Sequence, residues 1–179
     1  MSGSGRSWVG LALGANLGPR RKTLQQAVAM IADETGLRSS RLSGLFQSAP
    51  SGGVEGGDFL NCVLVGLTAL SPMQLLRSCR GAEAAAGSPV EKRGAARRLD
   101  VDVLFMQDAE PHPPQLLLPH PRLHLRDFVL VPLSQIWKDP VPGLESTSEQ
   151  LLRGLSGEIQ VEELAPAPPA GTLRWEDEG

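Results

Sequence analysis

The residues best suited to chemistry lie together in and just before an apolar segment that begins at Leu99. Asp100 and Asp102 are two positions apart, so on a β-strand their side chains would project from one face. Adjacent carboxylates repel each other unless a cation lies between them, and Mg²⁺ prefers such oxygen ligands together with substrate phosphates. The pattern indicates a magnesium site, although an Asp-x-Asp taken alone fits two solvated surface acids equally well.

A basic cluster precedes these acids in a chain whose net charge is -3. Its members are Lys92, Arg93, Arg97 and Arg98. Guanidinium groups bind phosphate oxygens through paired hydrogen bonds, so arginines beside a carboxylate pair favour a polyphosphate ligand with its metal. A basic loop alone is usually a solvated loop. The chain has neither a Walker loop nor a Gly-x-Gly-x-x-Gly fingerprint, so a nucleotide would be held in another way.

His120 lies between two prolines and is followed by Arg122, Arg126 and Phe128. The flanking prolines restrict the backbone, which favours a positioned imidazole, although a capping or packing role fits as well. The spacing of the three histidines in the chain matches no zinc site.

Phe59 and Asn61 are also two positions apart and would share a strand face. An aromatic ring can stack on a flat heterocycle, and an amide can both donate to and accept from its edge. Taken alone, a core phenylalanine and an asparagine that ends strand pairing explain these two residues better.

Length and composition set the class of protein. The chain has 179 residues, of which 41% are hydrophobic, and no apolar run approaches the roughly 18 residues of a spanning helix. The acidic balance, with a pI of about 5.6, argues against nucleic acid as a partner. Two cysteines without a disulfide pattern predict a reduced, cytoplasmic protein. The short apolar run near the N-terminus does not have the length of a signal sequence.

Hydrophobic periodicity and turn residues predict the order strand, helix, strand, strand, helix, strand. The expected ranges are 7–13, 19–34, 37–47, 59–70, 71–87 and 99–107. This is the order of the ferredoxin-like βαββαβ unit, an α+β fold with an antiparallel sheet and helices packed on one face. Additional C-terminal helices are expected within 121–137, interrupted at Pro132, and within 146–155. We expect a single domain over residues 1–164 and a loosely ordered acidic tail over 165–179.

The ordered set of motifs from Val9 to about Pro142 resembles the 6-hydroxymethyl-7,8-dihydropterin pyrophosphokinase family. The segments that carry the resemblance are Gly14-Ala15-Asn16-Leu17-Gly18, Pro50-Ser51-Gly52, Asp58-Phe59-Leu60-Asn61, Leu70-Ser71-Pro72 with Leu75-Leu76, Glu83, Arg97-Arg98-Leu99-Asp100-Val101-Asp102-Val103, Leu118-Pro119-His120-Pro121-Arg122 and Arg126-Asp127-Phe128-Val129-Leu130-Val131-Pro132-Leu133. Each is short, but together and in this order they are specific. The resemblance implies diphosphate transfer from ATP to the hydroxymethyl group of a reduced pterin, with release of AMP, in folate biosynthesis.

The resemblance also implies roles for individual residues. Asp100 and Asp102 would hold two Mg²⁺ ions and, with Arg97, would be catalytic. The residues implied for ATP binding are Glu83, Arg93, Arg97, Val103, His120 and Arg126. Those implied for pterin binding are Ser48, Ala49, Ser51, Phe59, Asn61 and Phe128. The expected partners are ATP and 6-hydroxymethyl-7,8-dihydropterin, with no nucleic acid and no membrane. A monomer is expected, with a dimer as the alternative.

The chain departs from the family pattern in the loop before the acids. The segment from Arg93 to Arg97 lacks the usual Trp and Pro, and Ser88 and Val90 stand at or near the positions of two usual arginines. Ser48-Ala49 also replaces the usual Thr-Pro. We therefore expect a loop that closes less firmly over ATP, and a gain in rate from tryptophan at Gly94 and arginine at Ser88. Two other functions stay open: an inactive pterin- or nucleotide-binding module, and a different Mg²⁺-dependent phosphoryl or nucleotidyl transferase.

Overall fold

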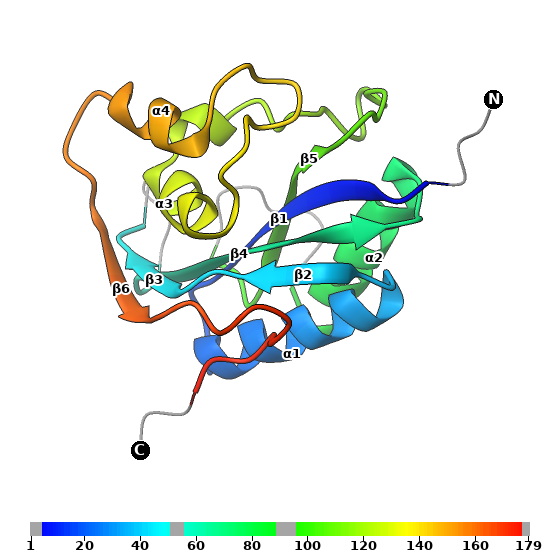
Figure 1. Cartoon of the computed structure of the whole chain (residues 1–179). Coiled ribbons are helices and arrows are strands. Elements are labelled where there is room, and N and C mark those ends of the chain that lie inside the picture. Colours follow the sequence, from blue (N-terminus) through cyan, green and yellow to red (C-terminus); the bar gives the residue numbers. More distant parts are fainter. Residues whose placement is uncertain (1–4, 51–55, 89–95, 177–179) are drawn as a thin grey trace.

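The computed structural model describes residues 5–50, 56–88 and 96–176. Figure 1 shows the order of the elements along the chain. The elements are β1 (Ser7–Ala15), α1 (Arg20–Glu34), β2 (Arg38–Leu42), β3 (Leu45–Ser48), β4 (Phe59–Thr68), α2 (Pro72–Ala85), β5 (Asp100–Met106), the short 3₁₀ helix η1 (Leu123–Leu125), α3 (Asp127–Ile136), α4 (Ser148–Arg153) and β6 (Val161–Ala165).

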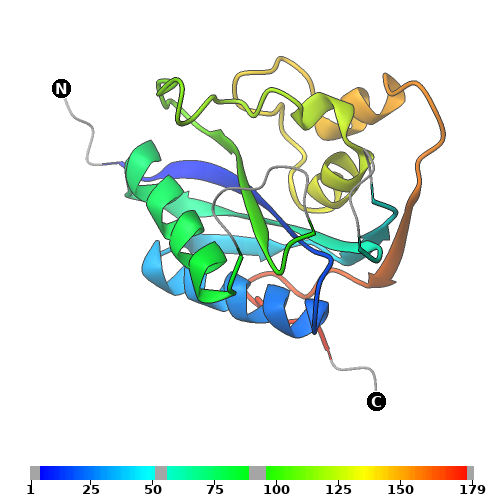
Figure 2. The same cartoon turned by 180° about the vertical axis from the view of Figure 1, so that it is seen from behind.

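The described strands form one six-stranded sheet with the order β5-β1-β4-β3-β6, and β2 also pairs with β4. Every pairing is antiparallel. If β2 and β3 are counted as one broken strand, the first five strands and two helices give the expected ferredoxin-like βαββαβ order. Helices α1 and α2 cover one face of the sheet, and α3 and α4 cover the other (Figure 1). Seen from behind, α2 lies beside the edge strand β5 (Figure 2).

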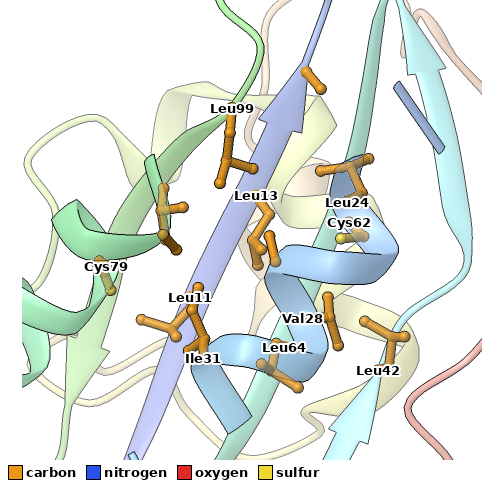
Figure 3. Close-up of a cluster of buried hydrophobic side chains, with 14 of the residues drawn as sticks. Leu11, Leu13, Leu24, Val28, Ile31, Leu42, Cys62, Leu64, Cys79 and Leu99 are labelled. Carbon is orange, nitrogen blue, oxygen red and sulfur yellow. The ribbon is translucent and has the colours of Figure 1, made fainter. Parts of the chain in front are cut away.

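The larger hydrophobic core lies between the sheet and the pair α1 and α2. In α1, the buried residues recur at helical spacing: Leu24, Ala27, Val28 and Ile31. Leu11 and Leu13 of β1 meet them from the sheet, because alternate strand residues face the same side (Figure 3). This packing fixes β1, which is the strand between β4 and β5.

A second core lies on the other face of the sheet, under α3. Val63 and Val65 of β4 pack there with Phe105 and Trp137. Helix α3 runs from Asp127 to Ile136 through Pro132, so the predicted interruption was wrong. A proline inside a helix removes one backbone hydrogen bond. Here the helix is held by burial, since five of its ten residues lie in the protein interior.

The predicted strand over 37–47 is two strands, β2 and β3, with Ser43 and Gly44 between them. The backbone N–H of Ser43 donates to the Val63 carbonyl at 2.9 Å, and its Oγ accepts from the Val63 N–H at 2.8 Å. The Gly44 N–H donates to Gln135 Oε1 at 2.8 Å. Side-chain hydrogen bonds therefore replace the regular ladder and divide the strand.

The C-terminal segment differs from the expected loose tail. Ala165, at the end of β6, pairs with Leu45 of β3. The Trp175 side chain is only 2% exposed, and its Nε1 donates to the Ser43 carbonyl at 2.9 Å. Gln25 of α1 donates to the Leu173 carbonyl at 2.6 Å and accepts from the Trp175 N–H at 3.2 Å. Ala165, Leu173 and Trp175 thus contact the sheet and α1, whereas most of the residues between them are exposed.

Both cysteines are buried and outside any disulfide. Cys62 lies on β4 and Cys79 on α2, and both belong to the larger core (Figure 3). Among residues 5–50, 56–88 and 96–176, no helix is long and apolar enough to cross a membrane.

Candidate active site

The acid pair Asp100 and Asp102 lies on β5, on the face of the sheet that carries α3. Val101 and Val103 point into the larger core, so the alternating aspartates point the opposite way. The Asp100 side chain is 42% exposed and that of Asp102 is 33% exposed. A ligand in solution can therefore reach both carboxylates. Val103, which the family resemblance implied in ATP binding, has its side chain in the core.

Three cationic or basic side chains from two separate segments meet the acid pair. Arg97 Nη1 lies 2.8 Å from Asp100 Oδ1, and Arg126 Nη1 lies 3.0 Å from Asp102 Oδ2. His120 Nε2 is 3.6 Å from that same oxygen of Asp102. The structure thus brings together five of the residues that the sequence singled out.

Burial and charge shift the protonation of these groups. Burial raises the pKa of Asp100, the Asp102 charge raises it further, and Arg97 opposes both effects. Burial lowers the pKa of His120 although Asp102 opposes the shift, so the imidazole is neutral at pH 7. The Asp100 shift thus comes first from burial and second from the neighbouring Asp102 charge.

Glu83 of α2 contacts the outer edge of β5. Its Oε1 accepts a hydrogen bond from the Val101 N–H at 2.9 Å, and burial raises the pKa of its carboxyl group. Because β5 is an edge strand, this side chain supplies a partner that a further strand would otherwise provide. Glu83 lies near Asp100, whose charge also acts on it.

The donor set of the acid pair suits a hard divalent cation. Within the described part of the chain, no group of three or more His, Cys, Asp or Glu could hold a metal ion. Asp100 and Asp102 can therefore supply only part of a coordination shell. Mg²⁺ is usually bound in this way, through one or two carboxylates, with phosphates and water as its other ligands.

The amide Asn61 and the aromatic Phe59 lie on the same face of the sheet, on β4, which is separated from β5 by β1. Gly14 of β1 pairs with Asn61 of β4 on one side and with Asp100 of β5 on the other. Asn61 is 6% exposed and donates from Nδ2 to Ser48 Oγ at 2.9 Å. Phe59 lies two residues before Asn61 and so shares its face.

Phe128 is in the first turn of α3 and is partly buried against the second core. The guanidinium of Arg126 lies 5.5 Å from the centroid of its ring. Arg126 therefore connects this ring to Asp102. Ala49 is exposed next to Ser48, whereas Ser51 and Arg93 lie outside the described residues.

The sequence model of the 7,8-dihydro-6-hydroxymethylpterin-pyrophosphokinase (HPPK) family matches residues 10–138, more than half of the chain. The chain belongs to this family. It is 37% identical over 143 residues to the Methylorubrum extorquens protein named 2-amino-4-hydroxy-6-hydroxymethyldihydropteridine pyrophosphokinase. That alignment covers 80% of this chain and 90% of the relative. The Bacillus subtilis protein of the same name is 34% identical over 126 residues, or 70% of this chain and 75% of the relative.

The fold of this HPPK family member also resembles a solved structure. The Plasmodium falciparum HPPK-DHPS crystal structure with pteroate aligns with a TM-score of 0.56 at 14% identity. The alignment covers 83% of this chain and 42% of that chain. At this level of identity, the likeness is evidence for the fold alone.

Asn16 lies beside the candidate site of this HPPK chain, and its residue type and position predicted no role for it. Its side chain is buried, its Oδ1 accepts from the Arg97 N–H at 2.7 Å, and its own N–H donates to the Arg97 carbonyl at 3.0 Å. A Cβ built on Gly56 would lie 2.7 Å from Asn16 Nδ2. Asn16 therefore joins three loops beside the acid pair. The only sign of this in the sequence was that Asn16 is a polar residue between Gly14 and Gly18, in the turn after β1.

Ser88 closes the loop that precedes β5. Its Oγ donates to the Leu99 carbonyl at 2.7 Å and accepts from the Leu99 N–H at 2.8 Å, and its side chain is buried. An arginine at this position would lose both bonds and place a charge in the interior. The sequence-based expectation that arginine at Ser88 raises the rate is therefore withdrawn. Val90 and Gly94 lie outside the described residues.

A separate hollow of about 740 Å³ lies at the start of α1. Its lining includes Arg20, Arg21, Lys22 and Arg174, and it shares no residue with the acid pair. Arg20 donates to the Asp58 carbonyl, one residue before Phe59. The converging charged side chains that define the candidate site lie instead at β5.

Proposed function

We propose that this chain transfers the diphosphate group of ATP to the hydroxymethyl group of 6-hydroxymethyl-7,8-dihydropterin and releases AMP, a step of tetrahydrofolate biosynthesis. Membership of the HPPK family supports this activity. The observation that carries it is the alignment of Asn61, Gly14 and Asp100 across three paired strands. The proposed pterin-binding amide and the proposed metal-binding acid pair thus lie on one face of the sheet, on either side of β1.

The reaction needs no nucleophilic side chain. The hydroxyl oxygen of the pterin attacks the β-phosphorus of ATP, the bond from that phosphorus to the α-phosphate oxygen breaks, and the hydroxyl proton is released. Positioning and charge neutralisation provide most of the catalysis in such transfers. The converging residues Arg97, His120 and Arg126 can provide both.

Arg97 and Arg126 are proposed to bind phosphate oxygens while they keep the acid pair in place. A guanidinium has five N–H donors in a rigid fork, so it can contact a carboxylate and a phosphate together. A neutral His120 can donate one hydrogen bond without adding to the positive charge. Arg93 and Glu83 remain proposed ATP contacts. Val103 is proposed to contribute through its backbone only, because its side chain is in the core.

Asp100 and Asp102 are proposed to hold two Mg²⁺ ions. When bound, these ions would neutralise the triphosphate charge and orient its oxygens. The two carboxylates are accessible and mutually repulsive, which supports this assignment. Asp102 also anchors Arg126 and His120, so one carboxylate would link the metal to two phosphate-binding side chains.

Phe59 and Phe128 are proposed to stack on the pterin, with Asn61 at its edge. Ser48, Ala49 and Ser51 would complete the pterin site. Asn61 Nδ2 already donates to Ser48 Oγ, which fixes the amide orientation and leaves Oδ1 directed toward Gly14. Because the Asn61 amide is already fixed by this hydrogen bond, it would lose little conformational entropy when the ligand binds.

The experiment is incubation of the protein with ATP, Mg²⁺ and 6-hydroxymethyl-7,8-dihydropterin, with separation of the nucleotides by chromatography. AMP and the pterin diphosphate should form in equal amounts. Formation of ADP, or absence of turnover, would contradict the proposal. Asp102→Ala should abolish AMP formation, whereas Glu149→Ala, at an exposed ion pair with Lys138, should leave it unchanged.

We also propose that the protein acts as a monomer in the cytoplasm. Its two cysteines are buried and unpaired, as suits a reducing compartment. Light scattering during gel filtration would test the monomer, and a mass near 38 kDa, twice the chain mass of 19.0 kDa, would contradict it.

A further inference from the structure

Two side chains cover the outer edge of β5, which is the last strand at its end of the described sheet. The edge of a sheet leaves backbone N–H and C=O groups without strand partners. Glu83 accepts from the Val101 N–H at 2.9 Å. The Ser88 hydroxyl donates to the Leu99 carbonyl at 2.7 Å and accepts from the Leu99 N–H at 2.8 Å. The backbone of Asp100 is therefore held at both neighbouring residues from outside, and by its pairing with β1 from inside.

Ser88 is itself fixed by the way in which α2 ends. The Ser88 N–H donates to the Glu83 carbonyl at 3.0 Å, and the Gly87 N–H donates to the Ala84 carbonyl at 2.9 Å. Gly87 has a φ of +76°, and a left-handed residue with these two bonds is the Schellman ending of a helix. Helix α2 is anchored in turn by its buried residues in the larger core. Ser88 thus has a fixed place at the end of α2.

The hydrogen bonds of Ser88 are shielded from water. Ser88 is 8% exposed, and Leu99 is fully buried. Without the hydroxyl, the N–H and C=O groups of Leu99 would be left unsatisfied in the interior, which is costly. The chain could avoid this cost by moving Leu99 toward water, and that movement would displace Asp100, the next residue. The Ser88 hydroxyl therefore opposes a displacement of the acid pair.

Arg97, on the other side of Leu99, is held independently of Ser88. Asn16 accepts from the Arg97 N–H at 2.7 Å and donates to the Arg97 carbonyl at 3.0 Å. Loss of the Ser88 hydroxyl should therefore act on the Asp100 carboxylate more than on the Arg97 guanidinium. This difference separates the proposed metal ligand from a proposed phosphate-binding group.

We propose that Ser88 is a positioning residue for the acid pair, an inference that rests on the proposed function. Its hydroxyl connects the fixed end of α2 to Leu99, and so keeps Asp100 where it can bind Mg²⁺ together with Asp102. Ser88 acts through the backbone of Leu99 rather than through a contact with the ligand. Loss of the hydroxyl lowers the contribution of Mg²⁺ to nucleotide binding and leaves the contribution of the arginines in place.

The test is Ser88→Ala, with the affinity for α,β-methylene ATP measured by calorimetry in Mg²⁺ and in EDTA. This analogue cannot release AMP, because carbon replaces the oxygen of the bond that breaks. The gain in affinity that Mg²⁺ provides should fall about 10-fold, as for other groups that orient metal ligands, while the affinity in EDTA stays within about twofold. Backbone hydrogen exchange of residues 99–101 should become faster. An unchanged Mg²⁺ gain, an equal loss in both buffers, or unchanged exchange would overturn the inference.

Ser43→Ala is the matched control. Ser43 is also a fully buried serine whose hydroxyl makes two bonds to backbone: it accepts from the Val63 N–H and donates to the Gly44 carbonyl, both at 2.8 Å. It lies between β2 and β3, and both β4 and β1 separate it from β5. This variant should lose stability in urea but keep the wild-type Mg²⁺ gain. A similar loss of that gain in both variants would overturn a specific role for Ser88.

Two further comparisons keep the outcomes separate. If Ser88→Ala does not fold, Ser88→Cys fills the same space with a thiol that is only a weak donor and acceptor. This variant should lose part of the Mg²⁺ gain, and full retention would overturn the inference. If the wild type gains affinity from Mg²⁺ but forms no AMP, the proposed function fails, while the calorimetry still decides the role of Ser88. A wild type without any Mg²⁺ gain would overturn the inference itself.

Discussion

Asn16→Ala should loosen the loops of the site and slow catalysis. The substitution leaves the Arg97 N–H without its acceptor at 2.7 Å, in a region where Asn16 is only 4% exposed. A buried donor left unsatisfied costs about 1–3 kcal/mol. This cost should raise the free energy of the conformation in which Arg97 is positioned for catalysis. The rate should therefore fall by roughly 5- to 150-fold, since about 1.4 kcal/mol is a factor of ten.

The assay is steady-state AMP formation together with denaturant unfolding of the same variants. Thr68→Ala is the control, because Thr68 is fully buried and donates to the Thr35 carbonyl at 2.8 Å away from the acid pair. It should lower stability without lowering kcat. Asn16→Asp retains an acceptor for the Arg97 N–H and should lose less activity than Asn16→Ala. If Asn16→Ala lost as much stability as Thr68→Ala but kept the wild-type kcat, Asn16 would have no role in positioning Arg97.

Three further outcomes are expected. Asp102→Asn should reduce kcat by roughly 100-fold or more in the AMP assay, because it removes a proposed metal ligand and the partner of Arg126; a loss below about tenfold would contradict the metal assignment. Burial raises the pKa of Cys79 to about 12, so at pH 8 only roughly one thiol in 10⁴ is ionised, and a thiol reagent should label it only after unfolding; rapid labelling of the native protein would contradict this. Trp175→Ala should lower the free energy of unfolding by about 3–5 kcal/mol in urea titration, and a loss below about 1 kcal/mol would show that residues 165–176 contribute little to the fold.

The regular elements could be predicted from the sequence wherever one periodicity dominated. The apolar stripe of α1, and Ser71 and Pro72 as the N-cap and first residue of α2, predicted both helices with nearly their observed bounds. Hydrophobic periodicity did not predict the structure at positions where a few individual contacts determine it. Ser43 breaks a strand through hydrogen bonds to Val63, and Trp175 anchors a segment whose composition indicates disorder.

The candidate site was predictable in its residues more than in its geometry. The spacing of Asp100 and Asp102 placed them on one face, but only the fold shows that Arg126 and His120 reach them across about 20 residues of chain. Asn16 was missed because its partner, Arg97, is 81 positions away in sequence. The roles of the individual side chains in binding ATP and pterin stay predictions.

The most direct test of the central claim is to identify the nucleotide product when the protein turns over ATP with 6-hydroxymethyl-7,8-dihydropterin and Mg²⁺. The acid pair and the aligned amide predict one AMP for each pterin diphosphate formed. They also predict no product when Mg²⁺ is chelated and recovery when it is restored. ADP as the product, or AMP formation that continues without a divalent cation, would contradict the account.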